Sequence, residues 1–147
     1  MSILAWLEAS GPARILAQSE WLYPLVNAGH IVGIALLVGT VAALDMRILG
    51  WLGRSIAIAD VERLLRPLAL IGLGLVIVTG LSLFSVQATS YAESTVFRIK
   101  LLLIAVAGLN AALYQTTTHR LWHQIMAALS LLLWLAVITM GRLIGFR

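Results

Sequence analysis

Residues 22–49 read LYPLVNAGHIVGIALLVGTVAALDMRIL, a run of apolar residues with few polar interruptions. A stretch of roughly 20 apolar residues is long enough to cross the hydrocarbon core of a bilayer as a helix. Three more such stretches follow, each after a short polar link. We therefore expect four transmembrane helices, at about residues 22–49, 64–86, 97–115 and 121–144.

The composition supports a membrane protein. Of the 147 residues, 61% are hydrophobic and 11% are charged, which is more apolar surface than a soluble domain of this size can bury. Lipid is therefore the expected partner for the excess. The chain has no cysteine, which excludes disulfides, thiolate metal sites and cysteine nucleophiles.

The short links predict an all-α, up-and-down bundle of four transmembrane helices over residues 21–147, because short connections make consecutive helices antiparallel neighbours. Residues 1–20 contain two short apolar stretches, at 3–7 and 13–17, separated by Ser10-Gly11-Pro12. Both are too short to span a bilayer, so we expect a short amphipathic interfacial segment. Trp6, Trp21 and Tyr23 would then lie at headgroup level.

The net charge of +4 does not indicate nucleic-acid binding, because the basic residues stand singly at the ends of apolar runs, where they meet lipid headgroups. Five arginines crowd around the first and third links, whereas the other side carries its basic residues more loosely. Positive residues in short loops favour the cytoplasmic side, so we expect both termini outside the cytoplasm. The two sets are Arg47, Arg54, Arg63, Arg66 and Arg120 against Arg14, Arg98, Lys100, Arg142 and Arg147.

Small residues recur at four-residue spacing in several of the predicted spans. Such rows let helix backbones approach closely in lipid, where packing drives association. They predict close packing within the chain or, alternatively, contacts in a homo-oligomer or a larger membrane complex. The pairs are Gly29 and Gly33, Ala35 and Gly39, Gly108 and Ala112, and Gly141 and Gly145.

His30 is the first candidate site residue, because an ionisable side chain inside a membrane is costly. At about 1.5 Å of rise per residue it lies roughly 12 Å below the surface at which its helix begins. Asn27 and Gly33 lie one turn away on either side, and a porphyrin needs such a gap beside its axial histidine. We therefore expect b-type haem at His30, or alternatively a hydrogen bond from His30 to a Ser or Thr of a neighbouring helix.

Depth along antiparallel helices limits the partners of His30. Thr79 and Trp134 fall at the level of His30, whereas His119 and His123 begin the last span on the order of 14 Å away. A second axial ligand would be Met140, the His30 of another copy, or water. His119 and His123 share a helix face at i, i+4, a spacing that can hold a metal, but no third ligand is near in the sequence. Interfacial histidines are the alternative.

Asp45 lies near the end of the first predicted span, at the surface that also carries Arg63, Arg66 and Arg120. A buried acid there needs a partner, so we expect a structural ion pair with Arg66 or Arg120, or alternatively a proton or ion path. Asn110 is expected to bond two helices together. Phosphate loops, nucleophile elbows, zinc-protease helices and paired carboxylates are missing from the sequence, so an ordinary hydrolase or kinase is not expected.

Short motifs are spread over nearly the whole chain from residue 22 onward: LYPLVNAGH (22–30), Gly33, Gly39, DMR (45–47), RP (66–67), FSVQA (84–88), FRIK (97–100) and GRLI (141–144). Together they resemble an uncharacterised family of small bacterial four-helix membrane proteins. This resemblance implies a bacterial cytoplasmic (inner) membrane protein and brings no catalytic residues. The His-x-x-Gly pattern of His30 and Gly33 is loosely similar to copper-resistance D-type proteins and b-type membrane cytochromes, but the Met- and His-rich runs of a copper transporter are missing.

Three functions follow from these features. The first is an electron-transfer protein that holds haem b at His30, with Asn27, Gly33, Thr79 and Trp134 around it. The second is a non-catalytic structural or assembly subunit that packs through its small-residue faces. The third is a transporter of metal ions or protons that uses His30, Asp45 and the inward face of the last span.

Overall fold

The computed structural model describes residues 2–144, and all the regular secondary structure in that range is helical. Four of the helices are long and apolar enough to cross a membrane, so the prediction of an all-α chain with four such helices is confirmed. The helices are α1 (Ile3–Glu8), α2 (Gly11–Gln18), α3 (Leu22–Ile48), α4 (Ile58–Val86), α5 (Ala88–Glu93), α6 (Thr95–Tyr114) and α7 (Arg120–Ile144). Gly145 and Arg147, which entered the predictions above, lie outside the described residues.

Two helical segments extend beyond what the apolar runs predict. The helix α4 begins at Ile58 rather than at residue 64, because a helix does not stop where its residues become polar; Asp60 stands in its first turn and pairs with Arg63 at 3.5 Å. The short helix α5 lies in the polar link between the second and third predicted spans. Hydropathy marks the part of a helix that meets lipid, so it misses both segments.

The chain forms two compact units. Unit 1 consists of Met1–Leu37 and Leu68–Ser94, and unit 2 of Val38–Pro67 and Thr95–Arg147. Each of the helices α3 and α4 therefore contributes one part to each unit.

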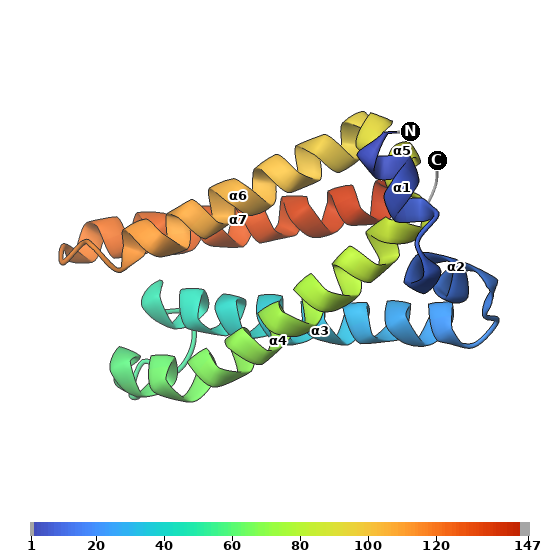
Figure 1. Ribbon diagram of the computed structural model, residues 1–147. Coiled ribbons are helices and arrows are strands. Elements are labelled where there is room, and N and C mark those ends of the chain that lie inside the picture. The colour runs from blue at the N-terminus through green and yellow to red at the C-terminus, as the bar shows by residue number, and fades with distance from the viewer. Residues whose placement is uncertain (1, 145–147) are drawn as a thin grey trace. The chain divides into compact units, whose positions relative to one another are not determined.

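In unit 1, α3 and α4 pack closely and antiparallel, with glycine at the points of contact (Figure 1). A Cβ atom at Gly33 would lie 2.9 Å from Val76 Cγ2, and one at Gly72 would lie 2.6 Å from the backbone nitrogen of Leu37. Any larger residue at Gly72 would have to push the backbone of α3 away. The prediction that Gly29 and Gly33 serve packing within the chain is confirmed, since Thr79 faces Gly29.

The N-terminal helices of unit 1 match the short stretches predicted at 3–7 and 13–17, and α1 packs on α5. Gln87 provides no side-chain cap for α5. The carboxylate of Glu8 supplies it instead, by accepting the backbone N–H of Thr89 at 2.8 Å. Ala88 is completely buried beside this contact, so α1 and α5 form a tight junction.

An aromatic cluster lies near that junction. Tyr91 stacks on Phe84 with ring centroids 6.2 Å apart. Burial, followed by the charge of Tyr23 and a hydrogen bond with it, raises the pKa of the Tyr91 hydroxyl above its usual value. The hydroxyl therefore stays protonated and able to donate at neutral pH.

In unit 2, α6 and α7 form a helical hairpin and lie side by side along their length (Figure 1). Asn110 is buried in this contact, and its side-chain amide donates to the backbone carbonyl of Met126 at 3.0 Å. The prediction that Asn110 joins two helices is confirmed. The packed face of α7 consists of Ala127, Ser130, Leu133 and Val137.

The loop after α3, also in unit 2, is held by arginine side chains. Arg47 donates from Nε to the carbonyl of Ile56 at 2.7 Å, and Arg54 donates to the carbonyl of Gly50. Gly50 and Gly53 adopt positive φ angles of 77° and 57°, which residues with a Cβ rarely adopt. The loop therefore keeps a defined shape without apolar packing.

Candidate functional site

His30 is hydrogen-bonded to Thr79 in unit 1, with 2.9 Å between Nδ1 and Oγ1. The Thr79 hydroxyl gives its only proton to the carbonyl of Leu75, at 2.5 Å. His30 therefore donates from Nδ1 to Thr79. The predicted equal depth of His30 and Thr79 is confirmed, and the contact is the alternative that the sequence left open for His30: a bond to a hydroxyl of a neighbouring helix.

The surroundings of His30 are closely packed. A Cβ atom at Gly80 would lie 3.1 Å from Cε1 of the imidazole, so the ring lies directly against the glycine backbone. The gap expected at Gly33 is filled by Val76 and Leu75 of α4. This face of α3 therefore packs on α4 at Gly33, and haem at His30 stays a prediction. Asn27 is exposed, one turn before His30.

The histidines at the start of α7 have separate surroundings. His119 is exposed, whereas His123 is half-buried, with its ring centroid 4.5 Å from that of Tyr114. His123 donates from Nε2 to the carbonyl of Thr117 at 2.8 Å, because a carbonyl can only accept. Within residues 2–144, no three His, Cys, Asp or Glu residues come close enough to hold a metal ion together. A metal at His119 and His123 stays a prediction.

Asp45 is the unusual residue of unit 2. Its side chain is 6% exposed, and the hydroxyl of Ser130 on α7 donates to it. The second carboxylate oxygen, Oδ2, is the one buried side-chain polar atom among the described residues that has no hydrogen-bond partner. Buried polar atoms in folded proteins nearly always have a partner, so a bare carboxylate oxygen requires an explanation.

The expected ion pair of Asp45 with Arg66 or Arg120 is not present among the described residues. Both arginines are exposed, and the carboxylate is turned to Ser130 instead. The physical reason is the length of the arginine side chain, which lets the guanidinium reach water and headgroups rather than a buried acid. The sequence analysis did not pair Ser130 with Asp45.

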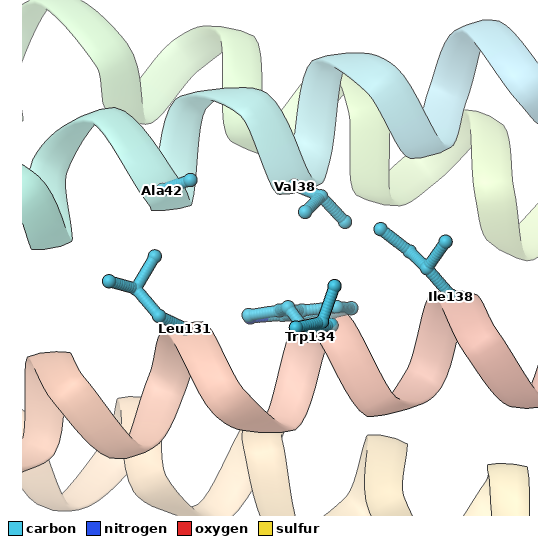
Figure 2. Close-up of a pocket in the computed structure, with 6 residues that line it drawn as sticks. Val38, Ala42, Leu131, Trp134 and Ile138 are labelled. Atoms are coloured by element: carbon cyan, nitrogen blue, oxygen red, sulfur yellow. The ribbon is translucent and has the colours of Figure 1, made fainter.

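An apolar groove lies in unit 2 between α3 and α7, with a volume of about 290 Å³. Figure 2 shows the Trp134 ring edge-on between Leu131 and Ile138, with its face turned toward α3. The groove is lined by Val38, Ala42, Leu131, Trp134, Leu135 and Ile138. The sequence did not predict it, and the expectation that Trp134 lies beside His30 stays a prediction.

Asp45 and Ser130 do not line this groove, and helix geometry places both of them just beyond one of its ends. Asp45 follows Ala42 by one helical turn on the same face of α3, and Ser130 precedes Trp134 by one turn on α7. The groove is thus lined by apolar side chains, and a buried carboxylate lies one helical turn beyond Ala42.

These features define the class of the protein: a multi-pass integral membrane protein with four apolar spanning helices and a buried carboxylate within one span. Comparisons of the chain with models of known protein families, with curated proteins and with solved structures find no match. The function is therefore argued from the site itself.

Proposed function

We propose that the protein is a membrane transporter that binds a proton or another cation at Asp45. The observation that supports it is the bare Oδ2 atom of this carboxylate, buried within a candidate transmembrane helix. Acidic residues inside the membrane are rare and typically mark proton relays and ion pathways.

The electrostatics of the site favour a cation. An ionised carboxylate loses much of its hydration on burial, and no arginine side chain within residues 2–144 forms an ion pair with Asp45. One hydroxyl, from Ser130, occupies one oxygen and holds the group in place. A proton or a cation on Oδ2 would neutralise the charge and complete the hydrogen bonding.

Two other polar side chains within the spans, Asn110 and His30, do not have this character. Asn110 bonds to the backbone of α7, and the Nδ1 atom of His30 bonds to Thr79. Both contacts join helices, so they need no ligand to explain them. Asp45 differs because its contact with Ser130 leaves the Oδ2 atom of the carboxylate without a hydrogen-bond partner among the described residues.

Two other functions stay proposals: haem b at His30, and an assembly role through the small-residue faces. Neither has a supporting observation comparable to the unpaired Oδ2 atom of Asp45. An absorption spectrum of the purified protein, oxidised and dithionite-reduced, tests the first: a Soret band lost in His30→Ala would support it. Membership of the uncharacterised bacterial family, a place in the inner membrane and termini outside the cytoplasm likewise stay proposals.

Transport is tested by reconstituting the full chain in liposomes that enclose a pH-sensitive dye. With an imposed proton gradient, we expect a flux that Asp45→Asn lowers by at least tenfold and Ser130→Ala lowers less. The matched control is Asp60→Asn, which removes an exposed acid paired with Arg63. Flux that is the same in Asp45→Asn and in the unaltered protein would overturn a role for Asp45 in proton movement.

Because Asp45 is also proposed to take other cations, the same liposomes are tested with imposed gradients of sodium, potassium and a divalent metal ion. Failure of all of these to move in an Asp45-dependent way would reject inorganic ion transport by this protein.

A further inference from the structure

We infer that the groove between α3 and α7 binds a small lipophilic amine in its protonated form. The apolar body would lie between Val38 and Ile138, and the ammonium group would lie at the end that carries Asp45. This inference rests on the proposed function, because it takes from it Asp45 as the cation-binding group, and it adds the chemical class of the substrate.

The walls of the groove set the apolar part of the ligand. Five of its six lining side chains are aliphatic, and the sixth is the indole of Trp134. A volume of about 290 Å³ is just below the range for small-molecule sites, roughly 300–1,000 Å³, which favours a small ligand. A hydrated inorganic ion would leave this apolar surface unused, whereas a compound with one aromatic ring would cover it.

The polar end sets the charge of the ligand. Oδ2 of Asp45 is buried and has no hydrogen-bond partner within residues 2–144, so a ligand group that reaches it must donate. The face of a tryptophan ring attracts cations, and Trp134 turns such a face into the groove (Figure 2). Ser130, which is hydrogen-bonded to Asp45, lies one helical turn from Trp134 along α7, about 6 Å of helix rise.

The arrangement also sets the orientation. Along α3 the order is Asp45, Ala42, Val38, while along α7 it is Ser130, Trp134, Ile138. The carboxylate is therefore at one end only, and a ligand with a single ammonium group has one favoured direction. A molecule with charges at both ends would place one of them against Val38 and Ile138.

The test is calorimetric titration of the full chain, in nanodiscs of phosphatidylcholine, with 2-phenylethylamine as the probe. We expect saturable binding that Asp45→Asn weakens by at least tenfold and Trp134→Leu by severalfold, with Asp60→Asn as the unaffected control. Equal binding to Asp45→Asn and to the unaltered protein would overturn the inference. So would a lack of saturable binding.

Three further arms separate the contributions. The alcohol 2-phenylethanol has the same ring and a donor but no charge, and we expect it to bind at least tenfold more weakly; equal binding would show a site for neutral compounds. Benzyltrimethylammonium keeps the charge without an N–H group, and we expect intermediate affinity; affinity equal to that of the amine would remove the hydrogen bond to Oδ2 from the inference. Replacing half of the lipid by phosphatidylethanolamine should leave amine binding within twofold; strong competition would mean that the ammonium group of a lipid occupies the site.

The two proposals can fail separately. Proton flux that depends on Asp45, together with no amine binding, would leave the proposed function in place and reject the lipophilic amine. Amine binding that depends on Asp45, with neither proton nor amine movement across liposomes, would reject transport and leave a binding site.

Discussion

The helix α3 carries two polar side chains that each meet a hydroxyl on another helix, and their surroundings differ. At His30, the partner Thr79 lies among glycines that bring the backbones of α3 and α4 close together. At Asp45, the partner Ser130 leaves one carboxylate oxygen bare, and a groove begins one turn away.

This difference distinguishes a polar side chain that serves helix packing, His30, from one that is proposed to bind a ligand, Asp45. A polar side chain whose bonds are completed by neighbouring helices, inside a closely packed contact, contributes to holding the helices together. A charged group kept incompletely bonded beside a cavity costs stability, and proteins retain such groups where function requires them. The first three of the four predictions below test whether the two regions differ in this way, and the fourth tests the contact between α1 and α5.

The largest effect is expected from Gly72→Ala. Its Cβ would lie 2.6 Å from a backbone atom of Leu37, so α3 and α4 must move apart. We expect the free energy of unfolding to fall by about 3 kcal/mol. The measurement is reversible unfolding in mixed micelles. Gly74→Ala is the matched control, because a Cβ there meets nothing within 4 Å outside its own helix. Equal losses in both variants would contradict close packing at Gly72.

His30→Ala should have the next largest effect. It removes the hydrogen bond to Thr79 and the contact of the ring with Gly80. Together these should lower the free energy of unfolding by about 2 kcal/mol. The exposed His119, changed to Ala, should stay within about 0.5 kcal/mol of the unaltered protein. If His30→Ala also left the free energy of unfolding unchanged, the hydrogen bond between His30 and Thr79 would not contribute to stability.

Asp45→Asn should act in the opposite direction. The amide keeps the size of the side chain and can still bond to Ser130, but it removes a buried charge whose Oδ2 has no partner. We expect the free energy of unfolding to rise by about 1 kcal/mol while flux is lost. Asp60→Asn, on the surface, should change neither quantity. A clear loss of stability in Asp45→Asn would indicate that the carboxylate is structural.

The smallest effect is expected from Glu8→Gln, which weakens the cap of α5 by removing the negative charge near its N-terminus. The loss should be about 0.5 kcal/mol. Hydrogen exchange localises it: the amides of residues 89–92 should exchange faster, while those of α6 keep their protection. Glu93→Gln, at the other end of α5, should leave those amides unchanged. Uniformly faster exchange in the Glu8 variant would argue against a local cap.

The sequence predicts the spans well because apolar length depends on local composition, and the helices α3, α6 and α7 end within a few residues of the predicted limits. It also matches His30 with Thr79, because depth follows from counting residues along antiparallel helices. Rotation about the helix axis is harder to predict. The pairing of Asp45 with Ser130, the closure of the gap at Gly33 and the groove at Trp134 all depend on which faces meet, and residue order alone does not determine that.

The contact between Glu8 and Thr89 has a consequence for the order of assembly, because these residues are 81 positions apart. Synthesis runs from the N-terminus at about 5–20 residues per second, so α1 emerges several seconds before α5. During that interval α1 lacks the surface on which it packs, and its exposed Trp6 can hold it at the lipid headgroups. α1 can therefore dock on α5 only after both α3 and α4 have been synthesised. A nascent chain in which α1 is still exposed has not yet completed its first pair of spans.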